Sequence, residues 1–196
     1  MTAPIRILGL SGSLRRQSLN TALLRAAAEL APAGVSVEII DLADLPFYNQ
    51  DIDGADAPAA AVALRTRLKA ADAVLLASPE YNYSIAPVLK NALDWASRPY
   101  GQSVLDGKPA ALLGVGGGMG TSRAQYHLRQ VGVFLNMHVL NKPEIFVVNA
   151  PGKFDDAGRL VDEPTRALLA QQLAALRDWT RLLQAGRAAL SAQAAE

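Results

Sequence analysis

Short apolar runs alternate with longer segments in which apolar residues recur at helical spacing. The apolar runs predict strands at Ile5–Leu10, Val35–Ile40, Ala73–Ser78, Ala110–Val115 and Ile145–Val148. The helical patterns predict helices at Leu19–Leu30, Ala59–Ala70, Ile85–Ser97, Arg123–Leu135 and Pro164–Ala185. Because the strands are almost continuously apolar, we expect both of their faces to be buried. The alternation predicts an α/β fold with a parallel sheet covered by helices.

The length of 196 residues suits one doubly wound domain, and we expect residues 1–196 to form it, since no repeat or linker divides them. No apolar stretch approaches the roughly 20 residues that span a membrane, and the first residues do not resemble a secretory signal. The chain has no cysteine and only two histidines, so we expect no metal site and a cytoplasmic location. Its formal net charge of +1 gives no field that attracts nucleic acid.

The first candidate for chemistry is the loop "GLSGSLRRQSLN" after the first strand. The dinucleotide fingerprint G-x-G-x-x-G fails because Ser11 stands where its second glycine belongs, although Asp41 imitates the acid that binds a ribose. The loop also lacks the Gly-Lys pair of the P-loop, and its spacing misses the G-x-S-x-G elbow of hydrolases by one position.

What remains is a loop of hydroxyl groups that ends at a helix N-terminus, where backbone N–H groups and the helix dipole favour a phosphate. Ser13, Ser18 and Asn20 can donate to phosphate oxygens, and Arg15 or Arg16 can add a charged hydrogen bond. The alternative is that Ser18 is an ordinary N-cap and the arginines are solvated. The loop alone leaves both interpretations open.

Two further loops follow the third and fourth predicted strands. "SPEYNYSIAPVLKNALDW" (residues 78–95) offers backbone amides and the rings of Tyr81 and Tyr83 beside a flat ligand, or else the tyrosines pack and Asn82 forms a turn. "GVGGGMGTSRAQ" (residues 114–125) has glycines that allow the backbone to approach a planar ring. Because ligands of open α/β sheets bind outside the carboxyl ends of the strands, three such loops favour a common site.

The segments "GSLRRQSLN", "SPEYNYSIAPVLKNALDWASRP", "GGGMGTSRAQYHLRQ" and "NKPE" resemble the NADPH-dependent FMN reductase family of flavodoxin-like proteins, in particular its bacterial quinone, chromate and azo-dye reductase branch. They occur in order over roughly residues 5 to 150. The resemblance implies a flavodoxin-like three-layer sandwich with a five-stranded parallel sheet of order 2-1-3-4-5. It also implies bound FMN, with NADPH or NADH as the co-substrate.

The resemblance also implies roles for individual residues. The FMN phosphate would be held by the first loop, and the isoalloxazine would lie between the second and third loops. The implied cofactor-binding residues are Ser13, Leu14, Arg15, Ser18, Asn20, Pro79, Glu80, Tyr81, Asn82, Tyr83, Gly116 and Gly117. No catalytic side chain is expected, because the flavin carries the redox chemistry.

The function implied is transfer of a hydride or electrons from NAD(P)H to quinones, free flavin or another small acceptor. The alternatives are a non-enzymatic flavodoxin-type electron carrier, which the net charge of +1 argues against because such carriers tend to be acidic, and a nucleotide-binding sensor. The family implies a homodimer or homotetramer. Trp95 is equally suited to the core or to an interface, and Arg123 and Glu144 are candidates for an ion pair, within or between subunits.

Overall fold

The computed structural model describes residues 3–148 and 150–194 and has a parallel sheet at its centre. The strands of this sheet are β1 (Ile5–Ser11), β2 (Val35–Ile40), β3 (Ala73–Ala77), β6 (Pro109–Val115), β7 (His138–Val139) and β8 (Ile145–Val147). Their order is β2-β1-β3-β6, and both β7 and β8 pair with β6. With β8 as the fifth strand, this is the 2-1-3-4-5 order of a flavodoxin-like fold, which confirms the predicted topology.

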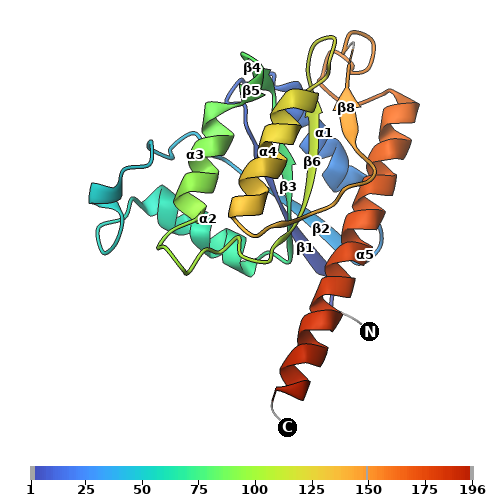
Figure 1. Cartoon of the computed structure of the whole chain (residues 1–196). Helices are drawn as coiled ribbons and strands as arrows, with labels where there is room; N and C mark the ends of the chain where they lie inside the picture. Colours follow the sequence, from blue (N-terminus) through green and yellow to red (C-terminus); the bar gives the residue numbers. More distant parts are fainter. Residues whose placement is uncertain (1–2, 149, 195–196) are drawn as a thin grey trace.

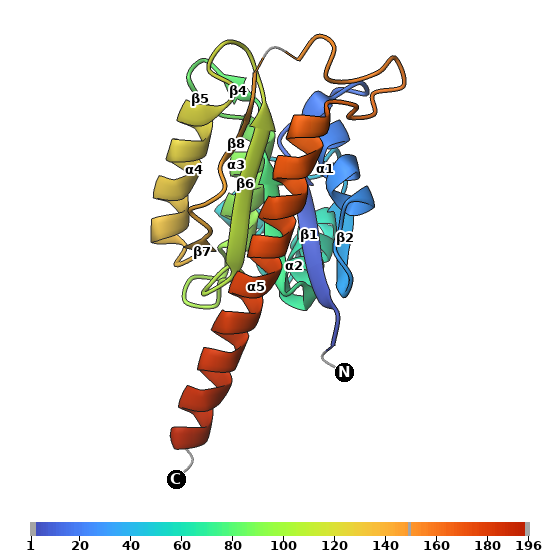
Figure 2. The same cartoon turned by 90° about the vertical axis from the view of Figure 1, so that its right-hand side faces the viewer.

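Helices cover both faces of the sheet. They are α1 (Leu19–Glu29), α2 (Ala59–Ala70), α3 (Pro87–Ala96), α4 (Ser122–Phe134) and α5 (Glu163–Gln193), with a short 3₁₀ helix at Gln50–Ile52. One apolar cluster joins α1 and α5 to one face, and a second cluster joins α2, α3 and α4 to the other. The resulting three layers are visible in Figures 1 and 2.

The central strands are buried on both faces, as their composition predicts. Every residue of β3 and β6 is buried, whereas β2 lies at the edge of the sheet and alternates between half-buried and exposed positions up to its last residue, Ile40, which is buried. Trp95 is fully buried, and its indole N–H donates to the carbonyl oxygen of Pro46 at 2.8 Å. This assigns Trp95 to the core rather than to an interface.

Three features differ from the predicted elements. The fifth strand position is divided between β7 and β8, which pair with the beginning and the end of β6. A hairpin of β4 (Glu80–Tyr81) and β5 (Ser84–Ile85) precedes α3, so that helix begins at Pro87 and not at Ile85. Helix α5 continues to Gln193, because its final segment is rich in alanine and has high helix propensity. Its last turns extend beyond the sheet (Figure 2).

The register of the strands brings three loops to one edge of the sheet. Ser11 pairs with Ala77, and Ala77 pairs with Leu113, so β1, β3 and β6 end side by side. The N–H of Gly12 donates to the carbonyl oxygen of Ala77 at 2.8 Å, and the N–H of Ser78 donates to that of Leu113 at 3.2 Å. No helix within the described part of the chain has the length and hydropathy of a membrane span.

Candidate ligand site at the carboxyl edge of the sheet

The loops after β1, β3 and β6 line one pocket with a volume of about 260 Å³. We call them the first loop (residues 12–18), the second loop (residues 78–86) and the third loop (residues 116–121). Eight of the predicted site residues line this pocket: Ser13, Arg15, Ser18, Asn20, Pro79, Glu80, Tyr81 and Gly116. The structure therefore brings together parts of the chain that are more than 100 positions apart in the sequence.

The first loop is held against the second loop by close packing at Gly12. A Cβ atom at this position would lie 3.0 Å from the Cβ of Ala86 and 3.1 Å from Cδ of Pro79, so a larger residue would push the two loops apart. The hydroxyl group of Ser11 bonds to that of Thr21 at 2.8 Å and ties the start of the loop to α1. These two contacts fix the start of the first loop against the second loop and α1.

The N-terminus of α1 opens toward the pocket. Ser18 is its N-cap, and its hydroxyl oxygen accepts from the N–H of Thr21 at 3.2 Å. The N–H groups of Leu19 and Asn20, in the first turn, have no carbonyl partner within the helix, and both residues line the pocket. Together with the helix dipole they favour an anion at this end of the pocket.

Arg15 supplies a positive charge beside this helix end. Its side chain lines the pocket, and no carboxylate of residues 3–148 or 150–194 lies within 4.0 Å of its guanidinium. Arg16 lines two neighbouring hollows but not this pocket. Of the two adjacent arginines, Arg15 therefore lines the pocket, and it is the one that the resemblance implies.

Asn20 has a different contact from the one predicted. Its side-chain amide donates to the carbonyl oxygen of Val115 at 3.1 Å, and its side-chain oxygen accepts from the N–H of Val115 at 2.9 Å. Both ends of the side chain are thus engaged by the last residue of β6. The expected hydrogen bond from the Asn20 side chain to a phosphate stays a prediction, which the second hydrogen of the side-chain amide would have to supply.

The second loop contains the β4–β5 hairpin, which turns at Asn82 and Tyr83 with positive φ angles of 49° and 69°. Glu80 has a carboxylate that is only 7% exposed and pairs with Arg123 of α4. Within the chain, Arg123 therefore pairs with Glu80 and not with Glu144, while the pair between subunits stays a prediction. Glu144 instead lies 3.9 Å from Arg129 and 2.8 Å from Lys142.

The ion pair between Glu80 and Arg123 stabilises the charged form of Arg123. The hydrogen bond to Glu80 raises the pKa of the Arg123 guanidinium above its usual value. Arg123 also lies over the ring of Tyr83, with 3.6 Å between the guanidinium carbon and the ring centroid. The charge on this side of the pocket is thus balanced within the protein, whereas Arg15 is left to attract an anion.

The glycines at the end of β6 and in the third loop differ in the space around them. A Cβ atom at Gly114 would lie 2.5 Å from the carbonyl oxygen of Ser78, so this glycine permits β6 to approach the second loop. A Cβ atom at Gly116 would collide with the carbonyl oxygen of Gly120 in the turn of the same loop. At Gly117 no described atom lies within 4 Å of such a Cβ, which leaves its face open to a ligand.

Four predicted site residues do not line the pocket: Leu14, Asn82, Tyr83 and Gly117. Leu14 is 54% exposed and lines the hollow beside β2. Leu19, Val115 and Ala150 line the pocket and were missed. The apolar patterns place Leu19 and Val115 in regular elements, so nothing in the sequence marked them as pocket residues.

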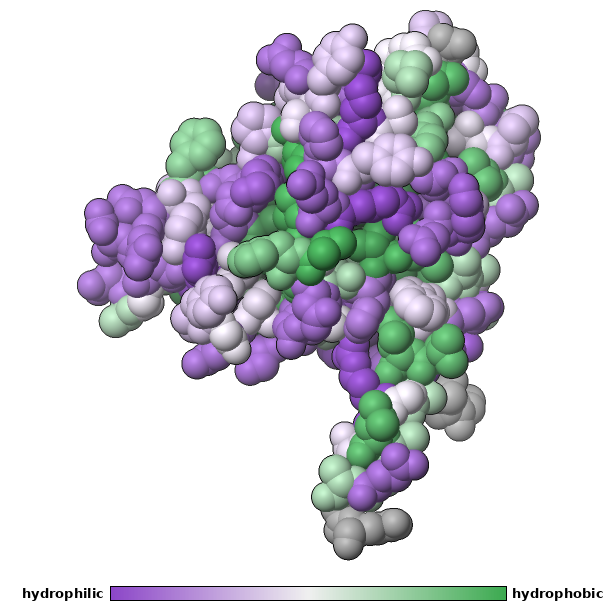
Figure 3. Space-filling view, viewed as in Figure 1, coloured by the Kyte–Doolittle hydropathy of each residue, from purple (hydrophilic) through white to green (hydrophobic). Residues whose placement is uncertain are grey.

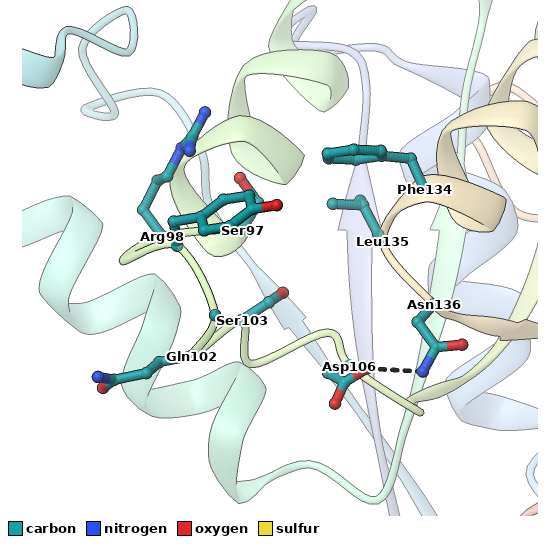
Figure 4. Close-up of a pocket in the computed structure, with 10 residues that line it drawn as sticks. Ser97, Arg98, Gln102, Ser103, Asp106, Phe134, Leu135 and Asn136 are labelled. Carbon is teal, nitrogen blue, oxygen red and sulfur yellow. Dashed lines mark hydrogen bonds between the residues drawn. The ribbon is translucent and has the colours of Figure 1, made fainter.

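A larger pocket, of about 460 Å³, lies at the opposite edge of the sheet, where β6 begins. Figure 4 shows Phe134 and Leu135 from the end of α4 on one side of it and Arg98 and Gln102 on the other. The side-chain amide of Asn136 donates to Asp106 at 2.7 Å along its edge. None of the three loops reaches this pocket, and ligands of such sheets bind at the other edge.

Comparison with known proteins finds one family and several similar sequences. The model of the family described as NADPH-dependent FMN reductase matches residues 5–152. An NAD(P)H-dependent FMN reductase from Pseudomonas aeruginosa is 52% identical over 185 residues, which cover 94% of this chain and 100% of that protein. An NADPH:quinone oxidoreductase from Arabidopsis thaliana is 50% identical over 187 residues, which cover 92% of this chain and 94% of that protein.

A solved structure is also similar. The flavoenzyme NAD(P)H:(acceptor) oxidoreductase of Paracoccus denitrificans matches with a TM-score of 0.81 and 34% sequence identity, over 90% of this chain and 97% of that one. The similarity in sequence and structure thus extends over most of each chain.

Proposed function

The chain belongs to the NADPH-dependent FMN reductase family, and from this premise we propose that it holds FMN in the three-loop pocket and passes electrons from NAD(P)H to a small quinone-class acceptor. The observation that carries the proposal is the convergence of all three loops on one pocket, with a helix N-terminus at one end. The alternatives of an electron carrier and a nucleotide sensor are not favoured, because the relatives are named as reductases.

The residues of the pocket fit FMN. At the end formed by α1, the hydroxyl of Ser13, the guanidinium of Arg15 and the first N–H groups of the helix would bind the phosphate. The backbone of Pro79, Glu80 and Tyr81 would border one edge of the isoalloxazine, and Gly116 would border it from the third loop. Leu14, Asn82, Tyr83 and Gly117 lie outside the pocket lining and would contact the cofactor only at its margin.

FMN held in this pocket would supply the redox chemistry, which is hydride transfer from a nicotinamide and electron transfer to a second substrate. The contribution of the chain is to bind and orient. Arg15 and the N-terminus of α1 hold the anionic end, while the hairpin and the third loop limit where a planar ring can lie. No protein nucleophile is required.

A homo-oligomer, dimer or tetramer, and a single unit formed by residues 1–196 complete the proposal. The exposed face of α4 supports an oligomer, because Tyr126, Val133 and Phe134 are 58%, 81% and 78% exposed. Figure 3 shows hydrophobic side chains gathered in a band across the face of the molecule that carries α4. Aromatic residues on such a surface are typical of subunit interfaces.

Anaerobic mixing of the FMN-loaded protein with NADPH tests the proposal. We expect the flavin absorbance to bleach and to return when a quinone is added. Steady-state kinetics should be ping-pong, since both substrates use one site in turn. A flavin that stays oxidised with NADPH and NADH would contradict the reductase assignment, and intersecting double-reciprocal lines would contradict the shared site.

A further inference from the structure

Glu80 and Arg123 connect the second loop to the helix that follows the third loop. We propose that they are positioning residues, which fix the distance between the two loops that border the flavin and thereby set the affinity and environment of the bound cofactor. The inference rests on the proposed function, but the connection itself can be tested without a ligand. Arg123 does not line the pocket, so it acts through Glu80.

The carboxylate of Glu80 closes the N-terminus of α4 from outside that helix. One oxygen accepts from the N–H groups of Arg123 and Ala124 at 3.1 and 3.3 Å, and the other accepts from Nε of Arg123 at 2.5 Å. Thr121, at the N-cap position, makes no side-chain cap hydrogen bond. The carboxylate of Glu80 therefore makes the hydrogen bonds that an N-cap side chain would make. It also lies at the end of the helix where the dipole favours a negative charge.

The hairpin that contains Glu80 depends on this contact. Each of its strands has only two residues, and an isolated two-stranded hairpin is at best marginally stable in water. Helix α4 braces it at two further points. Arg123 stacks over the ring of Tyr83, and Nδ1 of His127, one turn along the helix, hydrogen-bonds the hydroxyl of Ser84 at 2.9 Å.

Glu80 contacts α4 and also lines the three-loop pocket. Glu80 and Tyr81 line the pocket together with Gly116, which belongs to the loop that leads into α4. A change in the distance between Glu80 and the start of α4 therefore changes the width of the pocket. Loss of the Arg123 side chain removes the charged partner of the Glu80 carboxylate, which is only 7% exposed. We expect the hairpin to move, because the unpaired carboxylate is more stable when water solvates it.

The experiment compares Arg123→Ala with Arg129→Ala. Arg129 lies on the same helix, is also partly buried, and bonds to Leu140, Asn141 and Glu144 instead of the hairpin. Two measurements are made on each protein: hydrogen exchange of the amides of residues 80–85 in the apoprotein, and titration with FMN followed by flavin fluorescence and visible circular dichroism.

Arg123→Ala should speed hydrogen exchange in residues 80–85 and reduce the circular dichroism of the bound flavin. It should also weaken FMN binding by at least about 10-fold, which is the effect of one charged hydrogen bond. Arg129→Ala should leave all three near the wild-type values. Arg123→Lys should recover part of the affinity, because it restores the charge but not the planar contact with Tyr83.

The inference is overturned if Arg123→Ala exchanges and binds FMN like the wild type, or if both alanine variants lose affinity equally, which would indicate general damage to α4. If the wild-type protein itself does not bind FMN, the proposed function fails. In that case the exchange measurement still supports or overturns the brace between α4 and the hairpin.

Discussion

At the scale of single residues, the side chains around the pocket differ in whether their polar groups are already engaged. The hydroxyl oxygen of Ser13 accepts from the N–H of Arg15 at 3.4 Å, and the hydroxyl can still donate to a ligand. Arg15 has no carboxylate partner among the described residues, whereas Asn20 and Glu80 are held by backbone groups 95 and 43 positions away in the sequence. All four residues, which were predicted from the sequence, line the same pocket. The sequence could not assign their roles, because a long-range backbone partner leaves no local pattern.

Arg15 gives the sharpest prediction at this scale. Arg15→Ala should weaken FMN binding by about 10- to 150-fold, since a charged hydrogen bond contributes about 1.5–3 kcal/mol. Fluorescence titration of the apoprotein measures the change. Arg16→Ala is the matched control and should have little effect, because Arg16 does not line the pocket. If Arg16→Ala weakened FMN binding and Arg15→Ala did not, the phosphate would lie on the other side of the loop.

At the scale of elements, the pocket depends on contacts that join one element to the next. Asn20 fixes the start of α1 to the end of β6, and Gly12 lets the first loop pack on the second. The short apolar runs predicted the main strands, and the helical spacing of apolar residues predicted the helices. The β4–β5 hairpin was missed because two-residue strands carry no alternation, and its geometry depends on α4, far along the chain.

Asn20→Ala should lower the free energy of unfolding by about 1–3 kcal/mol, because it leaves the buried N–H and carbonyl groups of Val115 without their partner. Urea unfolding of the apoprotein measures the loss. Gln17→Ala, an exposed substitution in the same loop, should be neutral. A stable Asn20→Ala apoprotein that fails only to bind FMN would instead favour a direct contact with the phosphate.

The N-cap of α5 predicts a pH dependence. Hydrogen bonds from Thr165 and Lys153 lower the pKa of Asp162 below its usual value of 3.8. Its contribution to stability is therefore fully present above pH 3.8 and declines as the pH falls through the lower pKa of the folded state. Asp162→Ala should lower the Tm at neutral pH, and the difference from the wild type should shrink in acid.

Thermal unfolding of the wild type and of Asp162→Ala, from neutral pH to strong acid, measures this difference in Tm. The effects of the other carboxylates cancel, because both proteins contain them. Asp156→Ala, an exposed change in the preceding loop, should show no pH-dependent difference. A gap between Asp162→Ala and the wild type that stays constant in acid would contradict the role of the ionised cap.

At the scale of the whole molecule, the order of the parallel strands decides the position of the site. With β1 and β6 on either side of β3, the loops that follow all three strands lie at one edge. The alternation of elements predicted a parallel sheet, but the strand order came from the resemblance to a family and not from the pattern itself. The division of the last strand position between β7 and β8 depends on pairing with β6 that the sequence does not display.

The most direct test of the account is a comparison of FMN with riboflavin as ligands of the apoprotein. They differ only in the phosphate, and the first loop, Arg15 and the N-terminus of α1 are assigned to that group. We predict that FMN binds at least about 100-fold more tightly, as two charged hydrogen bonds would provide. Equal affinities would contradict the assignment of the first loop to a phosphate, and with it the orientation of the cofactor in the pocket.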